Sequence, residues 1–149
     1  MSFLDDEIHP SDWLGRRISS RSERRKAQHN KCGKGSPNTF ELRAGESELS
    51  VDRLCRDEHG SPYYDTELET IAAEELEVIG RNLYGWAALT KKQVEEINGL
   101  SVHKSRLCTN PYHAHISVDF SHLNSDNIRD ELARRARYVE RTVSAIDTQ

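Results

Sequence analysis

No apolar run in the chain approaches the roughly 20 residues of a membrane-spanning helix. The longest such segment, residues 83–89, is short and contains Gly85. There is no C-x-x-C pair and no signal-peptide pattern, and the cysteines, Cys32, Cys55 and Cys108, are odd in number and widely spaced. Internal repeats and low-complexity tracts are also absent. These absences argue against a membrane protein, a disulfide scaffold and a repeat array, and they predict a soluble cytoplasmic protein with reduced thiols.

Apolar residues are also scarce, at 35% of 149 residues, while charged residues make up 31%. The length suits one domain. The composition predicts that the N-terminal part of the chain does not pack into a hydrophobic core. The net charge of -4 hides a segregation of sign. Residues 16–34 hold eight basic side chains and one acidic residue, whereas residues 57–77 hold eight acidic side chains and no Lys or Arg.

The basic segment lacks interleaved aromatic residues, so stacking on nucleic-acid bases is not supported there. We interpret residues 1–38 as a basic, loosely ordered N-terminal arm and residues 39–149 as a single domain. Alternatively, the part from Arg16 to Lys34 meets phosphates or an acidic protein surface and folds on binding. The sequence leaves both interpretations open.

Within the domain, periodicity and turn residues predict strands and helices in the order β-α-β-α-β-β-α. The predicted segments are residues 49–54, 66–79, 83–89, 90–98, 100–107, 113–120 and 125–146. Capping boxes are expected at Thr66 with Glu69 and at Thr90 with Gln93, and Ser125 is expected to cap the longest helix. This order predicts an α+β fold: a small mixed sheet, helices mainly on one face and a long C-terminal helix.

The segment N-P-Y-H-A-H-I-S-V-D-F, residues 110–120, gives the best candidate site. Strict alternation places His113, His115, Ser117 and Asp119 on one strand face, with Ala114, Ile116, Val118 and Phe120 on the other. Candidate catalytic residues are His113, His115 and Ser117, with Asn110 as a substrate-orienting group. The alternative is a solvent-exposed strand face whose histidines have no functional role.

Two histidines at alternate strand positions can also converge on one divalent metal, because they share a face at a spacing of roughly 6.5–7 Å. The candidate ligands are His113, His115 and Asp119, and Cys108, His103 or His122 could complete the set.

Ala114-His115-Ile116-Ser117-Val118 resembles the apolar-His-apolar-Ser-apolar motif of two-histidine phosphoesterases. In that family, His is a general acid or base and the hydroxyl holds a phosphate oxygen. The second H-x-S here, at His103-Lys104-Ser105, lies only twelve residues earlier, and Lys104 replaces an apolar residue. The family's motifs instead come from two lobes far apart in sequence, so the chain departs from its pattern.

Candidate anion-binding residues are Arg53, Arg134 and Arg137, because a guanidinium grips phosphate or carboxylate in a forked geometry. Arg53 shares a strand face with Leu49 and Val51. It is therefore either a strand-end residue that reaches solvent or a partly buried charge with a partner.

A wider resemblance rests on S-P-N-T-F-E-L, E-L-S-V-D-R-L, Y-G-W-A-A-L-T and N-P-Y-H-A-H-I, followed by an Arg-rich helix. It spans about residues 36–116 and is similar to a group of small bacterial proteins in which S-V-D-R and N-P-x-H-A strand motifs recur. The resemblance implies a bacterial cytoplasmic origin and brings no activity.

Two function hypotheses follow. The first is a binding module that engages a protein or nucleic-acid partner through the basic arm and the C-terminal helix. The second is a small hydrolase or transferase acting on a phosphate-containing substrate through His113 and His115. An enzyme requires the polar strand face to line a concavity shared with Arg53.

Overall fold

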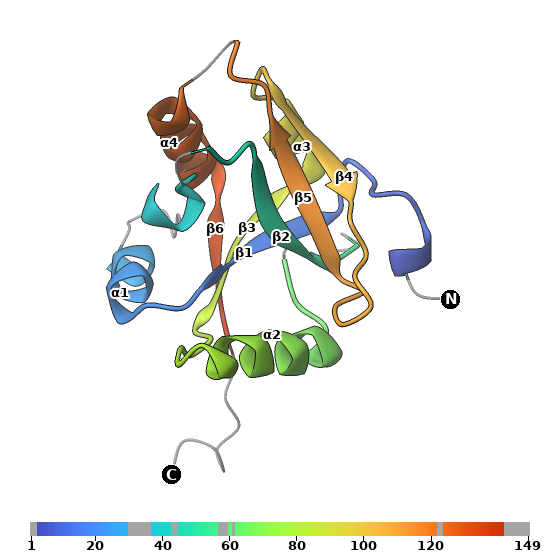
Figure 1. Ribbon diagram of the computed structural model, residues 1–149, viewed down its shortest axis with the longest axis vertical. Coiled ribbons are helices and arrows are strands. Elements are labelled where there is room, and N and C mark those ends of the chain that lie inside the picture. Colours follow the sequence, from blue (N-terminus) through green and yellow to red (C-terminus); the bar gives the residue numbers. More distant parts are fainter. Residues whose placement is uncertain are drawn as a thin grey trace.

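The computed structural model describes residues 3–29, 37–42, 45–56, 60, 62–121 and 124–141. Six strands form one sheet in the order β4-β5-β2-β1-β3-β6, and every neighbouring pair is antiparallel (Figure 1). The strands are β1 Trp13–Ile18, β2 Glu48–Cys55, β3 Gly85–Thr90, β4 Leu100–Lys104, β5 His113–Val118 and β6 Arg137–Glu140. The helices are α1 Arg21–His29, α2 Thr66–Val78, α3 Lys91–Glu95 and α4 Ser125–Arg135, with short 3-10 turns η1 Phe3–Asp5 and η2 Pro37–Phe40.

The α+β class is confirmed, but the prediction of a mixed sheet is wrong. Helix α2 connects β2 to β3, and these two strands run in the same direction. In a mixed sheet they would pair directly as parallel neighbours. Strand β1 lies between them and is antiparallel to both. Because β1 comes from the segment predicted to be an arm, its position between β2 and β3 could not be predicted from the sequence.

The predicted N-terminal arm is not confirmed for the part of residues 1–38 that the structure describes. Strand β1 lies inside the sheet, and its Trp13, Leu14 and Ile18 side chains are buried. At Gly15 an added Cβ would lie 2.9 Å from the Cβ of Trp86, so only glycine allows this approach of β1 to β3. Residues 30–36 of the expected arm lie outside the described residues.

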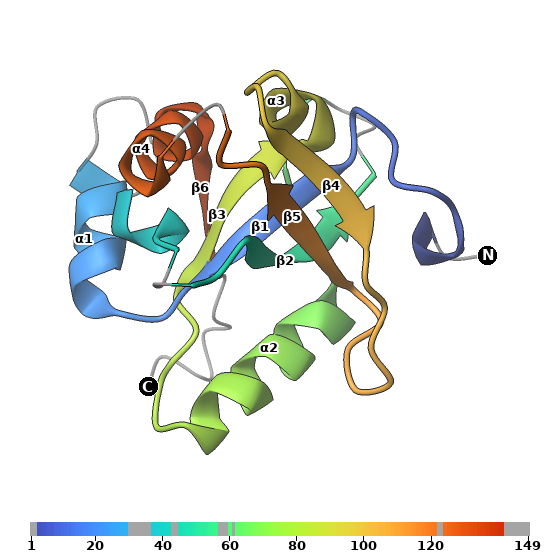
Figure 2. The same cartoon turned by 45° about the horizontal axis from the view of Figure 1, so that its top comes forward.

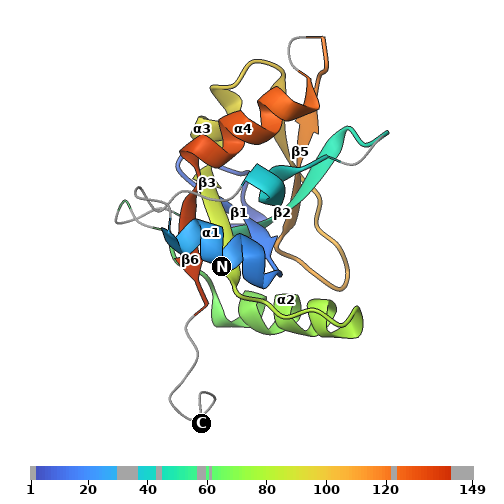
Figure 3. The same cartoon turned by 90° about the vertical axis from the view of Figure 1, so that its left-hand side faces the viewer.

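Two hydrophobic cores lie on opposite faces of the sheet. One combines Leu14, Val51 and Ile116 with buried residues of α3 and α4. The other combines Trp86 and Leu54 with Leu68, Ala72 and Leu76 of α2. Helices therefore cover both faces rather than mainly one, as Figures 2 and 3 show.

Of the helix caps predicted at Thr66 and Thr90, the structure contains the one at Thr90. The capping box of Thr90 and Gln93 is confirmed. Helix α2 begins at Thr66, as predicted, but its N-cap is Asp65 rather than Thr66, and the Asp65 side chain accepts a hydrogen bond from the backbone N–H of Glu67. Gly80 follows the helix with a φ of 74°, which suits glycine.

The prediction of a long C-terminal helix is wrong within the described residues. Asn124 rather than Ser125 is the N-cap of α4, and the helix ends at Arg135. After Ala136, the residues Arg137–Glu140 pair as β6 with the outer edge of β3. This pairing satisfies backbone groups that a continued helix would leave unpaired at that edge, and it packs Val139 against the second core. Residues 142–149 lie outside the described residues.

A fork divides the sheet between β1 and β2. These strands pair only from Trp13 to Gly15, opposite Asp52 to Cys55, and the register shifts within that short ladder. Beyond Gly15, β1 follows β3, whereas the first half of β2 follows β5. Figure 1 shows the two strands crossing and then separating. The halves β4-β5-β2 and β1-β3-β6 are therefore joined at the Trp13–Gly15 ladder and diverge toward Ile18 and Glu48.

Helices in the described part of the chain are too short, or too polar, to cross a lipid bilayer.

Candidate active site at the fork of the sheet

A cavity of about 390 Å³ lies at the fork, between the diverging strands and α2. Its polar lining includes Arg16, Arg17, Ser50, Asp52, Glu75 and His113. The volume is within the usual range for small-molecule sites. On the opposite face of the fork, Arg16 donates to the backbone oxygens of Thr39 at 2.9 Å and Ser50 at 2.8 Å. Through these two bonds Arg16 of β1 connects η2 to β2 and holds one wall of the cavity in place.

Asp52 is the centre of the site, although only 2% of it is exposed. Oδ2 accepts hydrogen bonds from Arg17 Nε at 2.8 Å and from the indole N–H of Trp86 at 3.0 Å. Oδ1 accepts from Arg17 Nη2 at 3.1 Å and from Asn110 Nδ2 at 3.3 Å. Four donors compensate the buried carboxylate and hold the forked guanidinium of Arg17 in one orientation.

Arg17 reaches from Asp52 to α2, where its Nη2 also lies 3.0 Å from Glu75 Oε1. Burial pulls the pKa of Arg17 down, but hydrogen bonds and charge from Asp52 and Glu75 outweigh it and raise that pKa above its ordinary value. Arg17 Nη1 has no hydrogen bond to any described residue. The Glu75 side chain is much more exposed than that of Asp52, so the bond to Glu75 is the weaker of the two.

His113 lies on the cavity wall in β5, as part of the polar strand face predicted from the sequence. Its Nδ1 lies 2.9 Å from the backbone oxygen of Ser105, which can only accept a hydrogen bond. Nδ1 therefore carries a proton, and in the tautomer that this bond selects Nε2 is the acceptor. Nε2 has no hydrogen-bond partner among the described residues. The arrangement is that of a general base or of a group that receives a ligand hydroxyl.

Asn110 also lines the cavity, but its amide is engaged within the protein. Besides donating to Asp52, it accepts a hydrogen bond from the backbone N–H of Tyr112 at 3.0 Å through Oδ1. Tyr112 in turn donates its hydroxyl to Asp65 Oδ2 at 2.8 Å, at the start of α2. Asn110 thus joins the β4–β5 loop to Asp52, and its role in orienting a substrate stays a prediction.

The predicted strand face is present, but it does not enter the cavity as a unit. His113, His115 and Ser117 are partly exposed, while Ala114, Ile116 and Val118 enter the first core. Of the three polar residues, only His113 lines the cavity. The His115 ring packs on that of His103, with centroids 5.4 Å apart.

The strand ends at Val118, earlier than predicted. Asp119 Oδ1 accepts from the backbone N–H of Ser121 at 3.0 Å in a turn, and Phe120 is 45% exposed rather than inward-facing. The described residues contain no group of three or more His, Cys, Asp or Glu side chains that could hold a metal ion. The metal site predicted from His113, His115 and Asp119 therefore finds no support in this geometry. His122 lies outside the described residues.

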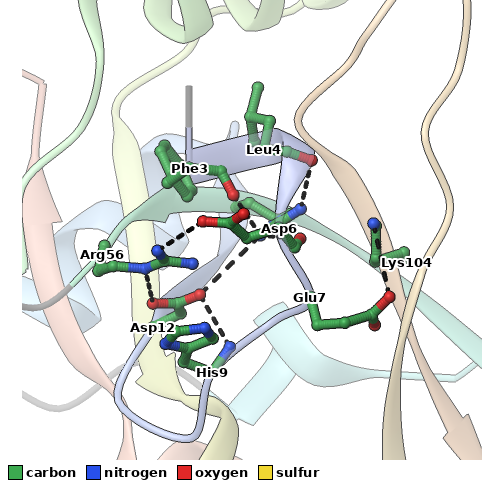
Figure 4. A network of polar contacts seen from close by, with 9 residues as sticks. Phe3, Leu4, Asp6, Glu7, His9, Asp12, Arg56 and Lys104 are labelled. Atoms are coloured by element: carbon green, nitrogen blue, oxygen red, sulfur yellow. Dashed lines mark hydrogen bonds and ion pairs between the residues drawn. The ribbon is translucent and has the colours of Figure 1, made fainter. Parts of the chain in front are cut away.

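The Nη1 and Nη2 groups of Arg53 are engaged away from the cavity. It is 2% exposed, and its guanidinium donates to the backbone oxygens of Phe3 at 3.1 Å, Leu4 at 3.1 Å and Asp6 at 3.3 Å. Asp12 Oδ2 lies 3.9 Å away and also accepts from the backbone N–H of His9 (Figure 4). Arg53 is thus the partly buried charge with a partner, and the concavity is shared with Arg17 instead.

The other two predicted anion-binding arginines also have partners. Arg134 forms an ion pair with Glu131 on α4. Arg137 lies on β6, with its guanidinium carbon 6.0 Å from the centre of the Trp13 ring. Neither lines the cavity.

Sequence reasoning missed Arg17, Asp52 and Glu75. The sequence places Arg17 in the predicted arm and Glu75 in the acidic segment of residues 57–77. The available signal was Asp52, a carboxylate inside the apolar strand L-S-V-D-R-L, since a buried charge there requires a partner.

In comparisons with protein-family models, with curated proteins and with solved structures, nothing matches this chain significantly.

Proposed function

We propose that the protein binds a small phosphate-containing ligand in the cavity at the fork, with Arg17 as the anion partner and His113 as the acceptor for a ligand hydroxyl. The observation that carries the proposal is the Asp52–Arg17–Glu75 arrangement beside an unpartnered His113 Nε2. Asp52 orients the guanidinium, and His113 stands on the same cavity wall. A hydrolase or transferase would use His113 as its general base.

In this proposal, Glu75 is an exchangeable counter-ion of Arg17. Exposed ion pairs contribute only about 0–1 kcal/mol, so a ligand phosphate displaces the Glu75 carboxylate from Arg17 at little cost. The buried Asp52 carboxylate is not displaced in the same way, because it would lose both hydrogen bonds from Arg17 and stay buried with only the donors of Trp86 and Asn110.

Glu75→Gln is therefore expected to bind inorganic phosphate and ribose 5-phosphate up to about fivefold more tightly than the natural protein, because the competing carboxylate is gone. Isothermal titration calorimetry measures the affinities, and ¹⁵N NMR of the imidazoles is expected to show a ligand-induced shift at His113. Glu77→Gln, an equal change of charge at another exposed position of α2, is the matched control. Equal gains in both variants would indicate bulk charge, and no binding by any variant would refute the proposal.

We also propose a second function, the engagement of a polyanionic partner such as nucleic acid, and α1 favours it. Arg21, Arg25 and Lys26 on this helix form no ion pair with any described residue, whereas Arg24 is paired with Glu140 at 2.6 Å. The arginines of α4 are unlike them, because Arg129, Arg134 and Arg135 all pair with carboxylates of their own helix. The proposed surface is therefore α1 rather than the C-terminal helix.

If α1 binds nucleic acid, the logarithm of the affinity for a fluorescent oligonucleotide should fall linearly with the logarithm of salt concentration. Replacing Arg21, Arg25 and Lys26 together by alanine is expected to reduce that slope by about two to three units. The same triple replacement at Arg129, Arg134 and Arg135 removes equal charge from paired positions and should change the slope much less. A slope that is flat, or equally reduced by both variants, would contradict this function.

A further inference from the structure

One row of side chains crosses the sheet on the face that carries the cavity. On the β4-β5-β2 half, His103 lies opposite His115, and His115 lies opposite Ser50. On the other half, Arg17 lies opposite Trp86. Ser50 is the small member of this row, is exposed and lines the cavity together with Arg17.

The two imidazoles in this row are already stacked. The rings of His103 and His115 have centroids 5.4 Å apart and planes inclined at 38°. His103 is held from its own strand, because its Nε2 lies 2.9 Å from Ser101 Oγ. His103 therefore packs against His115 from the β4 side. On the β2 side His115 lies opposite Ser50, whose side chain is small, and its Nε2 lies 3.9 Å from Glu48 Oε1.

The space above Ser50 thus has an imidazole on one side and the guanidinium of Arg17 on the other. Neighbouring strands lie about 4.8 Å apart, so β5 and β1 flank β2 at roughly 10 Å from each other, and the fork widens this further. Flat rings stack well on both His and Arg side chains. Side chains placed in this way, beside a cavity for which we propose anion binding, suit a ligand with a planar ring at one end and a negative group at the other.

We infer that the ligand of the cavity is a nucleotide or a similar heteroaromatic phosphate, whose ring lies over Ser50 and stacks on His115 while its phosphate pairs with Arg17. The inference rests on the proposed function and names its ligand class. The ring adds affinity without adding charge, and His103 supports His115 as the second layer of the stack.

Calorimetric titration with ribose 5-phosphate and with adenosine monophosphate tests the inference, because the two probes share the sugar and phosphate and differ in the ring. The nucleotide is expected to bind about tenfold more tightly, as one stacked base typically does. His115→Ala should reduce the ratio of the two affinities to near one. Ser117→Ala, the next residue on the same strand face and not a cavity residue, is the matched control and should keep the ratio.

The outcomes separate the two proposals. Equal affinity of the natural protein for both probes, or a ratio that His115→Ala leaves unchanged, would overturn the ring subsite and leave the phosphate site standing. Failure of both probes to bind would overturn the proposed function and the ring subsite together.

Discussion

Replacing Asp52 by alanine is expected to lower the free energy of unfolding by about 3–5 kcal/mol, as removal of one partner of a buried ion pair usually does. The replacement leaves the Arg17 guanidinium, the Trp86 indole N–H and the Asn110 amide without their common acceptor. The Trp86 side chain is fully buried, so water cannot readily replace the lost bond. The loss should also abolish ligand binding, because Arg17 is no longer oriented.

Urea unfolding followed by tryptophan fluorescence measures the change, and Trp86 reports directly on the site. Asp126→Ala is the control, since Asp126 is an exposed acidic residue of α4 and its removal should cost less than about 0.5 kcal/mol. Asp52→Asn should lie between the two, because an amide oxygen can still accept from Trp86. An Asp52→Ala protein as stable as the Asp126→Ala protein would show that Asp52 does not hold the fork together.

The polar strand could be predicted because its signal is local. From His113 to Val118, alternate residues enter the first core, and the period of two alone fixes both faces. The Thr90–Gln93 capping box was predictable for the same reason, since both of its bonds lie within four residues.

The cavity could not be predicted, because it depends on contacts between distant segments. Strand β1 reads W-L-G-R-R-I, with two adjacent arginines in a basic segment, which is an unusual sequence for a central strand. Arg17 is tolerated there because Asp52 and Glu75, at separations of 35 and 58 residues, neutralise it. The charge that made the segment look like an arm is therefore the charge that the site uses.

The C-terminal helix failed as a prediction for a related reason. Val139 fits both a helical stripe continuing from Leu132 and a strand that pairs with β3, and periodicity over so few residues does not separate the two. The edge of β3 that β1 leaves unpaired favours the strand, because β6 can pair there. The position of that edge cannot be predicted from a short sequence pattern.

Arg53 is the second residue whose removal should have a large effect, and the effect should be centred on the N-terminal segment. Burial lowers the pKa of Arg53, the charge of Asp12 opposes that shift, and a guanidinium stays protonated in proteins. Its bonds to the backbone oxygens of Phe3, Leu4 and Asp6 connect the first turn to β2. Arg56 strengthens the same attachment, with Nη1 2.9 Å from Asp6 Oδ2 and Nε 3.2 Å from the buried Asp12 (Figure 4).

Arg53→Met keeps much of the side-chain volume and removes the charge and the donors. We expect a loss of about 3 kcal/mol, because buried carbonyl groups and Asp12 lose a charged partner. Hydrogen exchange should accelerate in residues 3–12 well before it does in β5, because the hydrogen bonds of this arginine's side chain go to Phe3, Leu4 and Asp6. Arg106→Met removes another link to the same segment, the exposed ion pair with Asp5, and should cost less than about 1 kcal/mol. If the two variants were equally stable, the buried guanidinium would not be what fastens the N-terminal segment to the sheet.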